Sequence, residues 1–454
     1  MNGLFCMCSS LTTLDLSNFN TERVIDMGRI FQACENIQYL DLKYINTKQV
    51  TNMNSMFSKM TKLTSIDFSS LFNTEKVINM NQMFEYCISL TSLNLTFFNV
   101  SKVEYMAWMF QENTNLEYLD ISTFSPNSVI ILEGMFQYCT SLKLILLNNF
   151  NVSSATDLTN LFTHCESLTS IDMSGFITKN ALSFENMFQH CHKLKSIDLR
   201  SFNTEKLKQI SGMFQSCESI TSIDLSSFKT EQINYMSNLF SNCISLEKIN
   251  ITHFDISNVE DFSYMFYNCS SFISIDLSNF KTLNAIDMSY LFGNCYLLKE
   301  LNLTLFDTSN VISMKNMFLN CYSLTSLDVY NFNTENVQDM SYIFSNCSNL
   351  KIINISNFNT HLVSNISGMF NNCSSLTSLD LYNFNTYNVI DISKMFYFCS
   401  NLLYLNMASF FLYQVEKYET IFDGCYHLNL TIPSDYCYKI MDTIPDYVIV
   451  NELK

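Results

Sequence analysis

The sequence predicts an α/β repeat solenoid, in which a parallel sheet forms one face and short helices form the other. The first observation is a phenylalanine that recurs every 26 residues from Phe5 to Phe422, with one extra residue between Phe57 and Phe84. The second is a short alternation of apolar and polar residues in each repeat, and the third is a stretch with helical spacing. A unit of one strand and one helix cannot bury its apolar faces alone, so we expect the units to stack.

The first half of each repeat predicts a strand. In residues 11–17, LTTLDLS, Leu14 and Leu16 alternate with polar residues, which is the period of two expected of a strand with one buried face. The same alternation returns in the later repeats, so we expect short parallel strands side by side.

The second half of each repeat has the spacing of a helix. In one early repeat the apolar positions are Val24, Met27, Ile30, Phe31 and Cys34. Intervals of three, three, one and three residues place these side chains on one face of a short α-helix or 3₁₀-helix. Thr21, just before this stretch, is expected to cap that helix, and the glutamate that follows it suits a first helical turn.

The predicted organisation is about sixteen repeats over residues 1–425 and a C-terminal cap over residues 426–454. The chain starts part-way through a repeat, at MNGLF, which would leave an apolar end open. We therefore expect that further sequence, including an export signal, precedes this residue. The cap is expected to close the other end of the array.

The repeated L-x-x-L-x-L and M-x-x-M-F-x-x-C patterns resemble the BspA-like leucine-rich repeat surface proteins of bacteria and protozoan parasites. The resemblance covers nearly the whole chain, from Phe5 to Phe422. It implies a leucine-rich-repeat-like fold and a role in adhesion or partner binding at a cell surface, with no catalytic motif. This chain departs from the general pattern where many such repeats carry an asparagine ladder, because it has Phe19, Phe150, Phe176, Phe202, Phe228, Phe254, Phe280, Phe306, Phe332, Phe358 and Phe384 there.

Histidine and cysteine lie close together in FQHCHKL, residues 188–194, which raises the question of a zinc site. Fifteen of the 17 cysteines lie three residues after the repeated phenylalanine, one per repeat, so they cannot converge as a ligand set. We predict no metal and no cofactor, and interpret this column as reduced thiols in the core. The neighbouring histidines, His164 and His190, are expected to face solvent. A disulfide between Cys425 and Cys437 in the cap is an alternative for that pair alone.

The central column of the exposed sheet face is acidic, with asparagine at some positions and Leu146 as its one apolar member. Stacked carboxylates repel each other, so we expect hydrogen bonds from flanking Ser and Thr or a bound divalent cation. The favoured interpretation is a solvated ladder that keeps the sheet soluble, and the alternative is a surface for a cation or a basic partner. A uniform ladder singles out no acid and no base, which argues against an enzyme.

Positions that depart from the repeat are the candidate ligand-binding residues, because exposed aromatic and apolar anchors resemble interface hot spots. The first patch comprises Tyr118, Leu144 and Leu146, and Asp120 and Asp172 of the acidic column are candidate ligand-binding residues as well. The second patch comprises Tyr330, Ile352, Tyr382 and Tyr404. Trp108, the only tryptophan, is expected at an exposed helical position near the first patch.

The composition excludes several classes of protein. A net charge of −17 without any Lys/Arg-rich stretch argues against nucleic acid as a partner. No apolar run reaches the length of a membrane-spanning helix, and the N-terminus does not have the form of a signal peptide. The sequence thus predicts a non-enzymatic protein-binding or adhesion solenoid, at the cell surface or extracellular by family resemblance. An intracellular scaffold of the same fold is the alternative, which the many thiols and the lack of a visible signal peptide favour.

Overall fold

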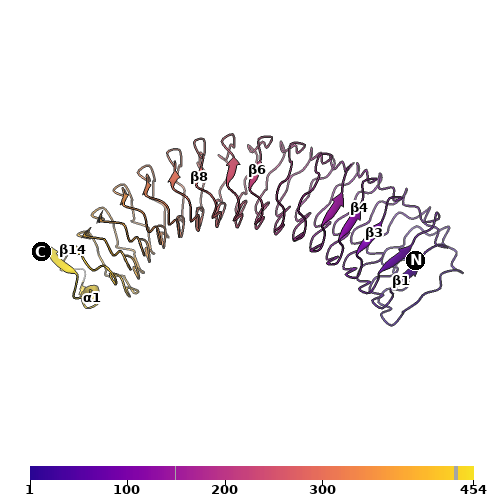
Figure 1. Cartoon of the computed structure of the whole chain (residues 1–454), viewed down its shortest axis with the longest axis horizontal. Helices are drawn as coiled ribbons and strands as arrows, with labels where there is room; N and C mark the ends of the chain where they lie inside the picture. Colours follow the sequence, from indigo (N-terminus) through magenta and orange to yellow (C-terminus); the bar gives the residue numbers. More distant parts are fainter. Residues whose placement is uncertain (149, 434–437, 454) are drawn as a thin grey trace. The chain divides into compact units, whose positions relative to one another are not determined.

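The computed structural model describes residues 1–148, 150–433 and 438–453 (Figure 1). The chain divides into two compact units, Met1–Gln232 and Ile233–Lys454. In each unit one repeat forms one coil, and paired strand residues such as Tyr118 and Leu144 are 26 positions apart. The predicted repeat solenoid with parallel strands is therefore confirmed within each unit.

The strands are short, and each coil contributes at most one to the strand face. In the first unit they are β1 (Tyr39–Asp41), β2 (Ser65–Asp67), β3 (Ser92–Asn94), β4 (Tyr118–Asp120), β5 (Leu144–Leu146) and β6 (Ser222–Asp224). In the second unit they are β7 (Lys248–Asn250), β8 (Ser274–Ile275), β9 (Glu300–Leu301), β10 (Ser326–Leu327), β11 (Ile352–Ile353), β12 (Ser378–Asp380), β13 (Tyr404–Asn406), β14 (Asn429–Pro433) and β15 (Ile449–Leu453).

Parallel pairing keeps equivalent residues of successive coils side by side. The strands β3, β4 and β5 form one sheet in this way, and β12, β13, β14 and β15 form another. In β4 the middle residue, Leu119, is buried while Tyr118 faces solvent, as the period of two predicts. The first and third residues of each strand therefore form the exposed strand face.

The predicted short helices are wrong, and the second half of each coil forms a series of turns that we call the turn side. In the coil of residues 183–191, the amides of Asn186 and Phe188 donate to carbonyls of the next coil at 2.9 Å, whereas the amide between them donates back three residues. Asn186 and His190 have positive φ angles of 54° and 58°, which interrupt any helix. Among the described residues α1 (Tyr438–Met441) is the one α-helix.

The helix cap predicted at Thr21 is also wrong, because its hydroxyl joins two coils. The Thr21 hydroxyl donates to the Asn46 carbonyl at 3.0 Å and accepts from the Asn46 amide at 2.8 Å. Threonines at the same place in other coils, such as Thr334, make the same donor contact. These threonines are buried, so the paired bonds satisfy polar groups that would otherwise be costly to bury.

Columns of identical side chains fill the core. The phenylalanines of the 26-residue period stack from coil to coil, with ring centroids of Phe162 and Phe188 separated by 5.6 Å. The second predicted phenylalanine column is buried, for example at Phe150 and Phe176, except at its first member, Phe19, which is half-buried. Both columns therefore run through the interior of the coils.

The cysteine column is buried as predicted except at Cys8, which is half-buried, and buried thiols such as those of Cys139 and Cys165 donate to the backbone of the preceding coil. The Cys191 thiol donates to the carbonyl of Phe162 in the preceding coil at 3.3 Å, and burial raises its pKa to about 12. Where Asn113 replaces a cysteine, its amide donates to the carbonyl of Phe84, which is the equivalent residue, at 2.9 Å. Cys425 is a free thiol, whereas Cys437, its suggested disulfide partner, lies outside the described residues.

Candidate ligand-binding face

The acidic column of the strand face closes turns. The Asp120 carboxylate accepts from the amide of Ser122 at 3.0 Å, and the Asp172 carboxylate accepts from the amide of Ser174 at 2.9 Å. Hydrogen bonds from Ser122 lower the pKa of Asp120, and those from Ser174 lower the pKa of Asp172. The expected hydrogen bonds from serine are therefore present, and they fix each carboxylate at the start of a turn.

The first predicted patch and the two candidate aspartates are brought together in part. Tyr118 is aligned with Leu144, and Asp120 is aligned with Leu146, on the adjacent strands β4 and β5. Tyr118 is 39% exposed and Leu144 is 47% exposed, so both present apolar surface to solvent. Asp172 lies one coil beyond Leu146, outside any described strand, and carries its own turn. The compact part of this set is thus Tyr118, Leu144 and Leu146.

The second predicted patch separates into different places. Ile352 and Tyr404 are the first residues of β11 and β13, so both lie on the strand face. Tyr330 and Tyr382 lie beyond the strand ends, because their amides donate to Asp328 and Asp380 and begin the turn. The strand face near the C-terminal end therefore keeps only Ile352 and Tyr404 from this set.

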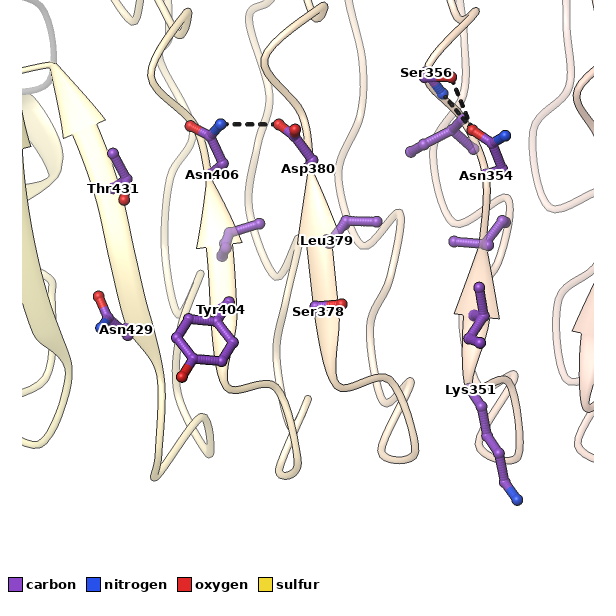
Figure 2. Close-up of a pocket in the computed structure, with 14 residues that line it drawn as sticks. Lys351, Asn354, Ser356, Ser378, Leu379, Asp380, Tyr404, Asn406, Asn429 and Thr431 are labelled. Carbon is purple, nitrogen blue, oxygen red and sulfur yellow. Dashed lines mark hydrogen bonds between the residues drawn. The ribbon is translucent and has the colours of Figure 1, made fainter.

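A shallow hollow of about 380 Å³ surrounds these two residues on β11 to β14 (Figure 2). The strands β11 and β12 belong to separate sheets among the described strands, and Ser378 of β12 lines the hollow. Asp380 accepts from the amide nitrogen of Asn406 at 2.9 Å, which ties β12 to β13 (Figure 2). Asn429 and Thr431 complete the polar lining, although the sequence prediction did not include them.

Sequence reasoning also missed a second aromatic hollow on the turns that follow β12 and β13. Tyr382 lines this hollow together with Tyr387 and Phe411. All three side chains are exposed. These positions hold polar residues in many other repeats, and that contrast in the sequence could have identified them.

The histidines stack on one another at the turn side. The rings of His164 and His190 are 4.2 Å apart, and His190 is 5.4 Å from His192. Burial, followed by the neighbouring His164 and His192, lowers the pKa of His190. These rings are only partly exposed, so the expectation that His164 and His190 face solvent holds in part.

Trp108 is not at an exposed helical position, contrary to the prediction. It lies in a turn with a φ of 56° and is partly buried. Its indole ring lies over Gly134 of the next coil, where a Cβ would come within 2.6 Å of Cδ1. The aromatic ring and the glycine are therefore complementary, and Trp108 supports the turn side.

Neither a cluster of metal ligands nor a membrane-spanning helix is found in the described part of the chain. No group of three or more His, Cys, Asp or Glu side chains is placed to hold a metal ion within those residues. None of the helical residues described here forms a segment long and apolar enough to cross a membrane.

The solved structures that are similar to this chain include two leucine-rich repeat proteins and an internalin. One from Bacteroides ovatus is 20% identical and has a TM-score of 0.43, with 83% of this chain and 88% of that chain covered. One from Eubacterium ventriosum is 15% identical with a TM-score of 0.35, covering 71% and 80% of the two chains. An internalin from Listeria monocytogenes is 15% identical with a TM-score of 0.22, covering 82% and 85%.

No curated protein is similar to the chain in sequence. A family model does match, in overlapping segments over residues 1–90, 65–171, 106–223, 182–301, 209–327 and 313–435. The matches together cover most of the chain, including every strand up to β14. The chain therefore belongs to the family described as "Mycoplasma protein of unknown function, DUF285".

Proposed function

We propose that the chain is a non-enzymatic binding protein that holds a protein partner on its strand face and acts in adhesion at a cell surface. One observation carries this proposal: Tyr118, Leu144 and Leu146 form apolar surface on two adjacent strands. In the equivalent places serine is the commonest first residue and aspartate the commonest third residue of a coil. Exposed aromatic and aliphatic anchors on a rigid support suit the centre of a protein interface.

The surroundings of the patch support a protein as its partner. Lys143 and Glu117 form an ion pair of 2.9 Å next to Tyr118 and Leu144, where the strands begin. Asp120, with one carboxylate oxygen already fixed by Ser122, lies beside Leu146. Apolar anchors with charged groups at the border match the usual layout of a protein interface.

A photo-crosslinking experiment tests the patch in cells that express the chain. A photoreactive phenylalanine derivative would replace Leu144 in one version and Tyr39 in another. Tyr39 has the same place in β1 and is also exposed, but it is aligned with Ser65, so it is a matched control. We expect a cross-linked protein from position 144 that is absent from position 39, and identical products from both would contradict the proposal.

Two substitutions then measure the contribution of the patch to the complex so identified. We expect Tyr118→Ala and Leu144→Ser each to weaken the affinity at least tenfold, because truncating a hot spot costs about 2 kcal/mol or more. The control Tyr39→Ala should change the affinity less than twofold.

The cell-surface location is a separate part of the proposal, and it rests on the resemblance to BspA-like proteins. The buried cysteine column instead favours an intracellular scaffold, because free thiols persist in reducing compartments. Surface biotinylation of intact cells decides between the two locations. Labelling of the chain without lysis supports the surface, whereas labelling only after lysis supports the scaffold.

A further inference from the structure

The side chains around Tyr404 on the strand face are polar, unlike those of the apolar patch around Tyr118. Tyr404 begins β13, and parallel pairing aligns it with Ser378 of β12 and Asn429 of β14. The third residues of the same strands are also polar and are aligned with one another: Asp380, Asn406 and Thr431. One exposed aromatic ring thus stands among five polar side chains.

From this arrangement we infer that the hollow on β11 to β14 binds a neutral saccharide, with one pyranose ring stacked on Tyr404. Tyr404 is 63% exposed, and Figure 2 shows its ring beside β13, between Ser378 and Asn429. A pyranose ring has an apolar face of C–H groups and a rim of hydroxyls. The tyrosine ring offers a flat apolar surface to that face, and the polar neighbours can reach the rim.

The hydrogen-bonding groups of the hollow are held in place before any ligand arrives. One oxygen of Asp380 accepts from the Tyr382 amide at 3.0 Å and from the Asn406 side chain at 2.9 Å. The other oxygen, Oδ2, has no protein partner among the described residues, so it can accept from a hydroxyl. Because the carboxylate is already fixed, it loses little conformational entropy when a ligand binds. This lower cost helps a ligand that is held by only a few hydrogen bonds.

The charge around Tyr404 favours a neutral ligand. Asp380 is the one carboxylate and Lys351 the one ammonium group that line the hollow. In Figure 2 the Lys351 side chain extends beyond the start of its strand, away from Asp380. Recognition of phosphate or carboxylate needs several convergent cationic donors, and the described lining does not supply them.

The size and composition of the hollow also suit a saccharide. Its volume of about 380 Å³ is within the range of roughly 300–1,000 Å³ for small-molecule sites. The polar side chains are amides, hydroxyls and one carboxylate, which can both donate to and accept from sugar hydroxyls. By contrast, Tyr118 is aligned with Leu144, so that ring lacks hydroxyl or amide partners on one side.

Saturation-transfer difference NMR on the full chain tests this inference. The probes are N-acetylglucosamine, galactose, mannose, cellobiose and lactose. We expect saturation of the ring protons of at least one probe, with loss of at least tenfold in affinity for Tyr404→Ala. Ser378→Val, which removes a hydroxyl aligned with Tyr404 and adds apolar bulk there, should have a similar effect.

Two further variants keep the result interpretable. Asp380→Asn retains a side-chain oxygen for the Tyr382 amide but removes the carboxylate acceptor, and it should weaken binding about threefold or more. Tyr330→Ala is the matched control, because this exposed tyrosine lies outside the hollow and its loss should change nothing. Circular dichroism and thermal unfolding of each variant establish that it is folded.

Three outcomes would overturn the inference: no transfer to any probe, transfer that Tyr404→Ala leaves unchanged, or transfer that Tyr118→Ala removes instead. Capture of a protein by the Tyr404 face, without saccharide binding, would likewise replace it. Because the Tyr118 patch is tested by cross-linking and by affinity for a protein partner, absence of saccharide binding here leaves the proposed protein-binding function standing.

Discussion

The turn side and the strand face of each coil differ in how firmly successive coils are joined. On the turn side of the first unit, isolated parallel bridges follow one another without a break from Asp26 to Gln209. On its strand face the described strands form separate sheets of two or three members. Ring spacings agree, since Phe162 and Phe188 are 5.6 Å apart on the turn side, whereas Phe202 and Phe228 beyond the strands are 6.5 Å apart.

This difference shows where stability and variation are located. The turn side holds the buried stack, the thiols and the bonds between coils, so its residues are constrained by both neighbours. The first and third residues of each strand contact mainly solvent, and they differ from coil to coil: Tyr39, Ser65 and Lys248 share one place in the repeat. Substitutions should therefore separate into those that unfold the coil and those that change only binding.

The largest expected effect is from Phe188→Ala on the turn side. Phe188 is fully buried between Phe162 and Phe214, at ring distances of 5.6 and 5.7 Å. Truncation leaves a cavity in a stacked core, which costs about 3–5 kcal/mol of the free energy of unfolding. Urea unfolding measures it, with Phe97→Ala as a control, because Phe97 is exposed. An equal cost at both positions would remove the distinction between core stack and surface.

A smaller effect is expected from Gly134→Ala, which adds a Cβ where φ is +58° and Trp108 leaves no room. We expect a loss of about 1–3 kcal/mol in the free energy of unfolding. The double variant Trp108→Asn with Gly134→Asn copies the Asn160 and Asn186 pair found in the same places two coils on, and asparagine tolerates positive φ. It should recover most of the loss, and a double variant as unstable as Gly134→Ala would show that the ring is not the obstacle.

The thiol column predicts a loss of stability at alkaline pH. Burial raises the pKa of Cys191 from 9.0 to about 12, so the folded state keeps the thiol protonated while the unfolded chain loses the proton above pH 9. The stabilisation is complete below pH 9 and is lost as pH rises towards 12, by roughly 1 kcal/mol per pH unit for each such thiol. Urea unfolding between pH 8 and pH 11 measures the slope. Cys191→Asn, which copies the natural replacement at Asn113, should give a shallower slope, and an unchanged slope would contradict this account.

The strands and the core columns could be predicted because the same apolar positions recur in every repeat. The helices could not, since intervals of three, three, one and three residues fit a helix and a series of turns equally well. Bonds from Phe188 to the next coil decide between the two, and a single repeat does not show them. Asparagine and glycine are frequent at the positions with positive φ, for example at Asn186 and Gly134, and this was the one signal in the sequence against a helix. Other coils have residues such as Trp108 in the same places, which hides the signal.

The candidate site was predicted in part for a related reason. A period of two places Tyr382 on the same face as Asp380. This placement would be correct if strand β12 continued to residue 382. The strand ends at Asp380, whose carboxylate accepts from the Tyr382 amide and turns the chain away. Tyr404 has its predicted place because it begins a strand, where the alternation still applies.

The smallest expected change in stability belongs to Leu146→Asp, which restores to β5 the residue type found in most coils. The new carboxylate can close the turn after β5 as Asp120 does after β4, while it adds repulsion with Asp120 beside it. We expect the free energy of unfolding to change by less than about 0.5 kcal/mol. The same substitution should weaken capture of the protein partner at least tenfold, because it places a charge in the apolar patch. Affinity and urea unfolding measured on one preparation test both statements, and a large loss of stability would mean that the strand face is part of the core after all.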